Sequence, residues 1–329
     1  PHLRKQGDAV QLVVDEEPYL IIGGELHNSS SSSLDYMKPI WSRLKALHIN
    51  TVLAVVAWDM VEPEEGVFDF SLVDGLIREA RRIDLRLVLL WFGTWKNGMS
   101  SYAPSWVKRD FNRFPLVKIE GGRSIEILST FGDATCEADA KAFAALMAHL
   151  HEVDGRKNTV IMVQVQNEVG VLGDSRDRSA AADAAFAGAV PPQLMAQLTE
   201  HQSELGSGLL QRWEAHGLKA GGTWEEVFGS GVETDELFMA WHYARYVDAV
   251  AAAGKAEYPL PLFANAWLSS LGSEPGGWAS GGQKPGEWPS GGPLPQTMDV
   301  WMAGAPNIDF LAPDIYQPEF EAWCQQYVR

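Results

Sequence analysis

The sequence predicts an α/β fold in which βα units surround a parallel sheet. Short apolar runs alternate with longer segments of helical spacing, which is the pattern of repeated βα units. The runs are rich in Val, Ile and Leu at successive positions, as expected for strands that are buried on both faces. With 329 residues, 46% of them hydrophobic, the chain can bury one large core.

Six segments have the composition of buried strands, and residues 50–57 (Asn-Thr-Val-Leu-Ala-Val-Val-Ala) are the clearest example. The expected strands are residues 18–24, 50–57, 85–92, 159–166, 260–267 and 308–316. They correspond to six of the eight strands of a (β/α)8 TIM barrel, so the sequence predicts an incomplete barrel.

Segments with helical spacing connect these strands. Met37, Trp41 and Leu44 form one apolar stripe, and Ser71 is expected to be the N-cap of the next helix. The serine run at 29–33 is expected to be a loop that ends in a helix N-cap. The expected helices are residues 35–49, a segment that begins at 71, and residues 138–151, 192–216, 237–253 and 317–327.

We expect one catalytic barrel domain over residues 1–329, with two long insertions. Residues 171–232 are expected to form a helical excursion after the fourth strand, and residues 268–300 a loop rich in Gly, Pro and Trp after the fifth. This loop repeats the pattern Pro-Gly-x-Trp-x-Ser-Gly-Gly, with Trp278 and Trp288 at equivalent positions. The two tryptophans either face a substrate from a lid or belong to a structural cover, and the sequence favours neither.

Composition excludes several classes of partner. The formal net charge of −17 argues against nucleic acid, because an acidic surface repels phosphate backbones. No apolar run approaches the roughly 20 residues needed to cross a bilayer, so we expect no membrane partner. Dinucleotide- and phosphate-binding motifs are missing and the histidines lack ligand spacing, so we expect no cofactor and no catalytic metal. A neutral substrate rich in hydroxyl groups suits this composition better.

Glu168 is the strongest candidate for a catalytic residue. It follows the fourth strand directly, so its side chain is expected at the C-terminal face, where barrel enzymes build their active sites. Cleavage of a glycosidic bond requires a carboxyl group that protonates the leaving oxygen, and Asn167 can donate a hydrogen bond to a sugar 2-hydroxyl. An isolated Asn-Glu pair would be an ordinary polar cap. Here Gln164 and Gln166 make one face of the strand end polar, which favours a site.

The first half of the sequence resembles glycoside hydrolase family 35, with the related family 42 close behind. The matching segments are residues 23–28 (Gly-Gly-Glu-Leu-His-Asn), 58–70 (with Glu-Pro-Glu-Glu-Gly-Val-Phe-Asp-Phe), 87–95, 104–107 and 166–170 (Gln-Asn-Glu-Val-Gly). Both families belong to a clan of retaining (β/α)8 glycosidases. The resemblance implies that Glu168 is the acid/base and that Asn167 holds the sugar.

Three positions depart from the pattern of family 35. Asn28 stands where the family often has Tyr, and Gly93-Thr94-Trp95 stands where it tends to have Ala-Glu-Trp. Gln166 replaces the first residue of the usual Glu-Asn-Glu. These positions lie in the sugar-binding subsite of the family, so the resemblance implies the reaction class more firmly than it implies galactose specificity.

Other polar and aromatic side chains at the expected strand ends complete the predicted site. The substrate-binding residues that we expect are Asn167, Gln166, His27, Asn28, Trp58, Trp95, Asn97, Trp267 and Tyr316. Tryptophan rings can stack on the C–H faces of sugar rings, and the polar groups offer hydrogen bonds to hydroxyls. Core packing is an equal alternative for Trp58, Trp267 and His27.

The resemblance places the nucleophile, a Glu, at the end of a seventh strand. Tyr316 is similar to the clan Tyr that hydrogen-bonds this nucleophile. Glu319 and Glu321 are expected in the first turn of the following helix, where the helix dipole favours acidic groups. Asp314 is expected to be a structural residue within its strand. We therefore expect the nucleophile and the last two strands beyond Arg329, in a longer protein.

The sequence thus predicts a retaining, exo-acting β-glycosidase, most similar to β-galactosidases, that removes terminal β-linked sugars by double displacement. An endo-acting β-glycanase and a non-catalytic carbohydrate-binding barrel are the alternatives. A periplasmic or secreted location would fit substrates derived from polysaccharides.

Overall fold

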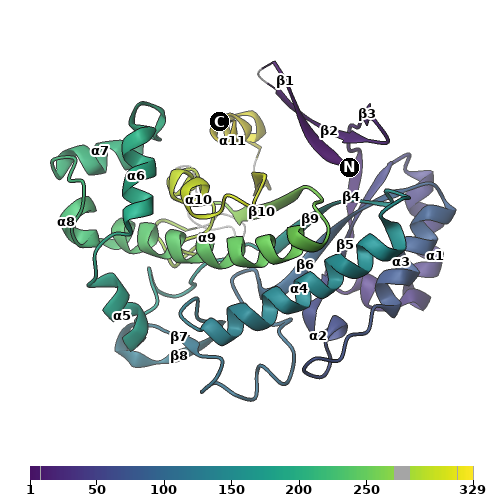
Figure 1. The fold of residues 1–329 in the computed structure, drawn as a ribbon, viewed down its shortest axis with the longest axis horizontal. Coiled ribbons are helices and arrows are strands. Elements are labelled where there is room, and N and C mark those ends of the chain that lie inside the picture. Colours follow the sequence, from purple (N-terminus) through teal and green to yellow (C-terminus); the bar gives the residue numbers. More distant parts are fainter. Residues whose placement is uncertain (8, 270–281, 317, 329) are drawn as a thin grey trace.

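The computed structural model describes residues 1–7, 9–269, 282–316 and 318–328. Its centre is a curled six-stranded sheet with the order β4-β5-β6-β9-β10-β11 (Figure 1). The strands are β4 (Gly23–Glu25), β5 (Thr51–Ala57), β6 (Arg86–Lys96), β9 (Val160–Asn167), β10 (Leu262–Trp267) and β11 (Phe310–Asp314). All neighbouring pairs are parallel and follow the order of the chain, so the predicted incomplete TIM barrel is confirmed.

Long helices pack along one side of this sheet (Figure 1). The helices that connect or follow the barrel strands are α1 (Leu34–Ala46), α3 (Ser71–Arg82), α4 (Asp133–Asp154), α9 (Val232–Glu257), α10 (Met298–Gly304) and α11 (Phe320–Tyr327). Trp41 and Met37, from the predicted stripe of α1, are fully buried. At the start of α1, Ser33 accepts a hydrogen bond from the Tyr36 amide at 3.2 Å, so the cap expected from the serine run is confirmed.

The expected first strand at residues 18–24 is wrong. Glu17–Pro18 form strand β3, which pairs with β2 (Ala9–Val14) and, through it, with β1 (His2–Gln6) in a separate antiparallel sheet. The barrel strand begins only at Gly23. The Asn50 side chain binds the backbone of residues 20–22, which precede this strand. It accepts from the Ile22 amide at 2.9 Å and donates to the Leu20 carbonyl at 2.8 Å, so these two backbone groups bond a side chain and not the backbone of β5.

Two helix boundaries also differ from expectation. Ser71 is the first residue of α3 and not its N-cap, because its amide donates to Asp69 Oδ1 at 2.8 Å and Phe70 takes the cap position. The single helix expected at 192–216 is divided, because Leu205 and Gly206 have extended backbone that stops the helical ladder. Residues 171–232 hold α5 (Ala180–Phe186), α6 (Pro192–Glu200), η3 (Gln202–Glu204), α7 (Ser207–Ala215) and α8 (Trp224–Phe228).

Short elements at the C-terminal ends of the strands were not predicted. They are η1 (Ser30–Ser32), α2 (Trp58–Val61), β7 (Leu116–Lys118), η2 (Glu120–Gly122) and β8 (Ser124–Leu128). Elements of three to five residues leave no clear periodicity in a sequence, so hydrophobic patterning does not reveal them.

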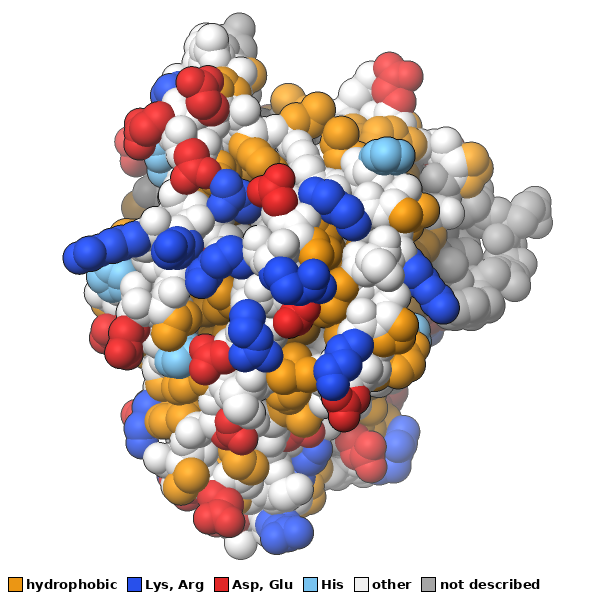
Figure 2. Space-filling view, turned by 90° about the vertical axis from the view of Figure 1, so that its right-hand side faces the viewer, with side chains coloured by type: hydrophobic (Ala, Val, Ile, Leu, Met, Phe, Trp, Pro, Cys, Tyr) orange, Lys and Arg blue, Asp and Glu red, His pale blue; other side chains and the backbone are white. Residues whose placement is uncertain are grey.

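Basic side chains are gathered on one face of this acidic protein. Figure 2 shows Lys and Arg side chains across the middle of the face on which α1 and α3 lie. Arg43 and Lys45 occupy the last turn of α1, and Arg81 and Arg82 the last turn of α3. Positive charge near the C-terminus of a helix is favourable because it meets the negative end of the helix dipole. Among the described residues, no helix is long and apolar enough to pass through a bilayer.

Helices α4 and α9 form a close contact in the largest hydrophobic cluster. Gly254 of α9 lies against Phe143 of α4, and both are buried. A Cβ atom added at Gly254 would stand 2.3 Å from Phe143 Cε1 and 3.1 Å from Met147 Cγ. The absence of a side chain at this position therefore sets how closely the two helices approach.

We predict that Gly254→Ala destabilises the protein by about 1–3 kcal/mol, because the new methyl group displaces the Phe143 ring in a filled core. The matched control is Gly208→Ala in α7, where an added Cβ meets nothing within 4 Å. That change should stabilise by up to about 1 kcal/mol, the helix-propensity difference between the two residues. Urea unfolding of both variants measures the effects. Equal stabilities for the two variants would contradict the tight contact.

Candidate active site

Four ionisable side chains from four strands meet at the C-terminal edge of the sheet. Glu25 ends β4, Lys96 ends β6, Glu168 follows β9 and Asp314 ends β11. The charge of each group influences the pKa of others in the set, which places them in one electrostatic cluster. Parallel strands bring their carboxyl ends to one edge, so residues far apart in the sequence converge there.

The backbone around Glu168 has a conformation that side chains other than glycine seldom adopt. Gln166 has φ 64° and Glu168 has φ 47°, so left-handed residues flank Asn167. Hydrogen bonds hold this turn: Gln164 Nε2 donates to the Gln166 carbonyl at 2.8 Å, and the Glu168 amide donates to Asn265 Oδ1 at 2.9 Å. Strained backbone that neighbouring groups hold in place is common at functional sites.

Gln166, which we predicted to bind substrate, is fully buried and engaged inside the protein. Its Oε1 accepts from the Trp95 amide at 3.0 Å, and its Nε2 donates to Asp139 Oδ2 at 2.6 Å. Asp139 lies on α4 and also accepts from the Trp91 indole at 2.8 Å and the Thr94 hydroxyl at 2.6 Å. Gln166 therefore fixes the ends of β6 and β9 against α4.

Asn167 has one side of its amide group fixed. Its Oδ1 accepts from Lys96 Nζ at 3.0 Å and from the Asn97 amide at 3.3 Å. Both partners can only donate, so the oxygen must face them, and this sets the orientation of the amide. The predicted residues Asn97 and Asn167 thus lie beside Glu168 and Lys96, as one group.

Asn265 and its bond to Asp314 were not predicted from the sequence. Asn265 of β10 is 3% exposed, and its Nδ2 donates to Asp314 Oδ2 at 2.6 Å. The carboxyl groups of Asp314 and Glu168 also lie close enough for each to shift the pKa of the other. An available signal was the polar Asn265 in an otherwise apolar strand, since a buried amide requires partners.

Burial and like charge raise the pKa of both members of this carboxyl pair. Glu168 is 5% exposed. Removal from water raises the pKa of Glu168, and the charge of Glu25 adds to this, while the hydrogen bond with Asp314 and the charge of Lys96 oppose it. Burial and the adjacent Glu168 raise the pKa of Asp314. The arrangement favours a state in which the pair retains one proton.

Trp58 and Trp95, both predicted to stack on sugar, are fully buried. The Trp58 indole donates to Glu62 Oε2 at 2.8 Å, and the Trp95 indole donates to the Leu128 carbonyl at 3.0 Å. Their rings lie in the core beneath the strand ends and present no face to solvent.

The remaining predicted residues lie at the strand ends. Trp267 is partly buried and pairs in register with Asp314, and Tyr316 is exposed. Partial removal of its hydroxyl from water and the charges of Asp314, Glu168 and Glu25 raise the pKa of Tyr316, so the hydroxyl lies near these groups although most of the side chain is exposed. His27 is exposed after β4.

Asn28 lies in a separate position beside β5. It lines a cavity of about 150 Å³ together with Ser31, Asp59 and Tyr102. None of the residues around this cavity belongs to the cluster of Glu25, Lys96, Glu168 and Asp314. The structure therefore separates Asn28 from the group that surrounds Glu168.

Comparison with known proteins gives the family. The sequence model of glycoside hydrolase family 42, described as beta-galactosidase, matches residues 30–213, which is more than half of the chain. The chain belongs to this family. The finer assignment to family 35 remains a prediction.

Two relatives of this chain are named as beta-galactosidases. The β-galactosidase of Xanthomonas manihotis is 30% identical over 171 residues, covering 50% of this chain and 26% of that protein. Beta-galactosidase 8 of Oryza sativa subsp. japonica is 29% identical over 168 residues, covering 50% of this chain and 23% of that protein. The chain therefore spans about a quarter of the length of these relatives.

Solved structures with the same fold include glycosidases of different kinds. The β-galactosidase from Bacillus circulans sp. alkalophilus has a TM-score of 0.54 at 15% identity, covering 91% of this chain and 40% of that chain. The catalytic domain of a β-amylase from Paenibacillus polymyxa has a TM-score of 0.53 at 13% identity, covering 89% of this chain and 75% of that chain. At these identities the likeness concerns the fold alone.

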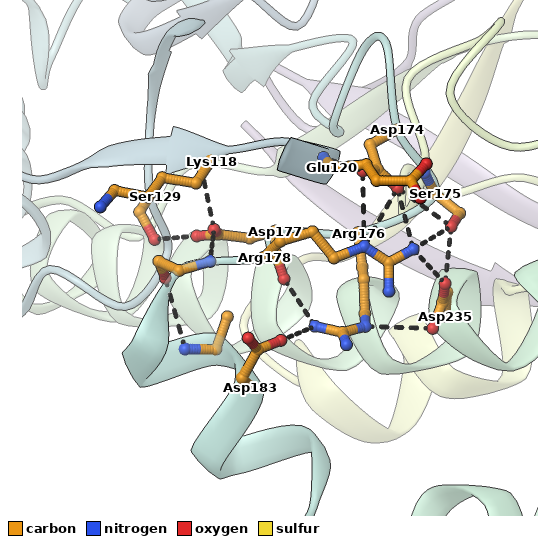
Figure 3. A network of polar contacts seen from close by, with 12 residues as sticks. Lys118, Glu120, Ser129, Asp174, Ser175, Arg176, Asp177, Arg178, Asp183 and Asp235 are labelled. Atoms are coloured by element: carbon orange, nitrogen blue, oxygen red, sulfur yellow. Dashed lines mark hydrogen bonds and ion pairs between the residues drawn. The ribbon is translucent and has the colours of Figure 1, made fainter. Parts of the chain in front are cut away.

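The segment that follows Glu168 in this family 42 chain is held by a buried network of charged groups (Figure 3). Arg176 donates to Asp183 Oδ1 at 2.6 Å and to Asp235 Oδ1 at 3.2 Å, which ties the segment to α5 and α9. Arg178 bonds Asp174 at 2.9 Å and Asp235 at 2.8 Å. Fixed charges on several elements hold the segment in one conformation, which supports the turn at Glu168.

The network also reaches β7. Asp177 accepts from the Lys118 amide at 3.1 Å and from the Ser129 hydroxyl (Figure 3). Among the described residues, no group of three or more His, Cys, Asp or Glu side chains is arranged to hold a metal ion.

Trp288, from the loop at 268–300, is part of a structural cover. It is 7% exposed, and its indole donates to Glu236 Oε1 of α9 at 2.7 Å. Gly170 supports this packing, since an added Cβ there would stand 2.3 Å from the Pro289 backbone. Trp278 lies outside the described residues. Burial raises the pKa of Glu236 to about 7.

We predict that Glu236→Gln flattens the pH dependence of stability between about pH 4.5 and 7. In the unfolded chain Glu236 loses its proton near its ordinary pKa of 4.5, whereas the folded protein retains it up to about pH 7. Stability present below the unfolded pKa is therefore lost as the pH rises through this window, by at most roughly 3 kcal/mol. Urea unfolding at several pH values measures the slope. Glu225→Gln, an exposed change on α8, should keep the wild-type slope. An unchanged slope in Glu236→Gln would contradict the raised pKa of Glu236 in the folded protein.

Proposed function

We propose that the protein is a retaining, exo-acting β-glycosidase, most similar to β-galactosidases, with Glu168 as its acid/base. The observation that carries this proposal is the position of Glu168, a buried carboxyl group on a strained turn at the end of the fourth barrel strand. Membership in family 42 supports the reaction class.

Glu168 has the electrostatic setting that a proton donor requires. Burial raises its pKa, which is the direction that a proton donor requires. In the first step the proton passes to the glycosidic oxygen as the bond to the anomeric carbon breaks. In the second step Glu168, now ionised, removes a proton from the water that attacks the glycosyl–enzyme intermediate.

Asn167 is proposed to hold the sugar. Lys96 and the Asn97 amide fix its oxygen, so the NH₂ group is the part of the amide that can donate to a sugar hydroxyl. A hydrogen bond to the 2-hydroxyl strengthens at the transition state and contributes to the rate. Lys96 therefore has a positioning role at this site.

The open strand ends around Glu168 are proposed to form the substrate pocket. Trp267 and Tyr316 offer an aromatic surface, and Asn97 offers polar groups. Gln166, Trp58 and Trp95 support the pocket from below, since all three are fully buried. His27, exposed after β4, is proposed to line the rim.

Asp314 is not assigned the role of nucleophile. Asp314 ends β11, the sixth strand of the barrel sheet. The resemblance to retaining glycosidases places the nucleophile at the end of the next strand. We retain the proposal that the nucleophile is a Glu at the end of a seventh strand.

We predict that Glu168→Gln lowers kcat/KM by about 100-fold or more on β-glycosides with poor leaving groups, the usual contribution of general acid catalysis. Activated aryl β-glycosides need little protonation, so their first step should be nearly unaffected. Azide, which needs no general base, should restore turnover of these substrates. Steady-state kinetics of the full-length protein on a series of aryl β-galactosides measures this.

Glu65→Gln is the matched control, because Glu65 is an exposed carboxylate that pairs with Arg113 at 2.7 Å away from the site. It should keep wild-type kinetics within about twofold, as expected for a surface ion pair. Equal losses on poor and activated substrates in Glu168→Gln, with no rescue by azide, would refute the acid/base role. Release of single terminal sugars from oligosaccharides is expected for exo action, and internal cleavage would contradict it.

A further inference from the structure

Asn265 connects the backbone of Glu168 to the carboxyl group of Asp314. Its Oδ1 accepts from the Glu168 amide at 2.9 Å, and its Nδ2 donates to Asp314 Oδ2 at 2.6 Å. The Glu168 amide can only donate, so the orientation of the Asn265 side chain is fixed. β10 lies between β9 and β11, and one buried amide from it thus sets the positions of two carboxyl groups on the adjoining strands.

The two carboxyl groups meet without a cation between them. Among the described residues, Lys96 forms no ion pair with either group and instead donates to Asn167 Oδ1 at 3.0 Å. Glu168 Oε2 is buried and has no hydrogen-bond partner among the described residues. An ionised carboxyl group can only accept hydrogen bonds, whereas a protonated one can also donate. One proton on the pair would therefore give this buried oxygen a partner, and two ionised groups would not.

We propose that Asp314 and Glu168 share one proton, and that Asp314 is a positioning residue that supplies this proton to Glu168 for the catalytic step. This inference rests on the proposed function for its role in catalysis, but not for the shared proton itself. The shared proton passes first to Glu168, and Glu168 then gives it to the glycosidic oxygen as the bond to the anomeric carbon breaks. Both carboxyl groups are then ionised. The attacking water returns one proton to the pair in the second step, so the count of protons balances.

The other charged groups that face the pair are consistent with one retained proton. Lys96 of β6 contributes one positive charge and Glu25 of β4 one negative charge. Tyr316, after β11, is neutral over the pH range in which carboxyl groups titrate, and it lies near the same groups. Two further negative charges on Asp314 and Glu168 would leave the cluster with a net charge of −2 around the buried Glu168 side chain. A shared proton reduces this to −1.

The test is a titration that does not depend on activity. The full-length protein is prepared with ¹³C-labelled Glu side-chain carboxyl groups, and Glu168→Gln identifies the Glu168 resonance. We expect the Glu168 carboxyl shift of the wild type to change in two separate steps with pH, because interacting carboxyls titrate as a pair. A single step near the ordinary pKa of Glu would overturn the proposal, whatever the protein's substrate.

Asp314→Asn, nearly the same size, should convert the titration of Glu168 to a single step. Its midpoint should lie at least about one pH unit below the upper step of the wild type, because the like charge is gone. Glu25→Gln removes a nearby negative charge that makes no hydrogen bond to Glu168, and it should preserve both steps. Two steps that persist unchanged in Asp314→Asn would also overturn the proposal.

The pH dependence of kcat/KM separates this inference from the proposed function. If both hold, the alkaline limb of the profile on poor leaving groups moves to lower pH in Asp314→Asn, by about the shift seen in the titration. A two-step titration in a protein without glycosidase activity would refute the function and keep the shared proton. Glycosidase activity together with a single-step titration would support the proposed function and refute the shared proton.

Discussion

One buried carboxyl group, that of Asp139, holds the ends of the central strands in place. It lies on α4, fully buried, and accepts hydrogen bonds from Trp91, Thr94 and Gln166. These donors belong to β6 and β9, so a single group fixes two strands and one helix relative to each other. A carboxyl group removed from water requires such hydrogen-bond partners. Loss of these donors would leave Asp139 buried without hydrogen bonds, which would destabilise the folded state. The strained turn at Glu168 begins at Gln166, one of the residues that make this contact.

The site above this support consists of side chains whose charges do not cancel by simple pairing. Lys96 donates to the side-chain amide of Asn167, and the carboxyl groups of Glu168 and Asp314 lie close enough for each to shift the pKa of the other. A buried carboxyl that retains its proton near neutral pH is the device that glycosidases use for acid catalysis. The Asn265 side chain holds this arrangement in place, since it accepts from the Glu168 amide and donates to the Asp314 carboxyl group.

The sequence predicted the parts of the molecule that depend on periodicity. The buried strands, α1 and the position of Glu168 follow from apolar runs and from where they end. Side chains at strand ends were harder, because a Trp or Gln has the same appearance in a sequence whether it faces sugar or core. Trp95 and Gln166 proved to be buried supports. The contact between Asp314 and Glu168 spans 146 positions and depends on sheet register, which local patterns do not encode.

The central claim is that Glu168 faces the glycosidic bond. A crystal structure of the full-length protein with a thio-linked β-galactoside, which the enzyme cannot cleave, tests it most directly. We predict that the bridging sulfur lies within hydrogen-bonding reach of the Glu168 carboxyl group, with the sugar 2-hydroxyl within hydrogen-bonding distance of the Asn167 side chain. A sugar that binds elsewhere, such as in the cavity beside Asp59 and Tyr102, with Glu168 still enclosed, would contradict the account.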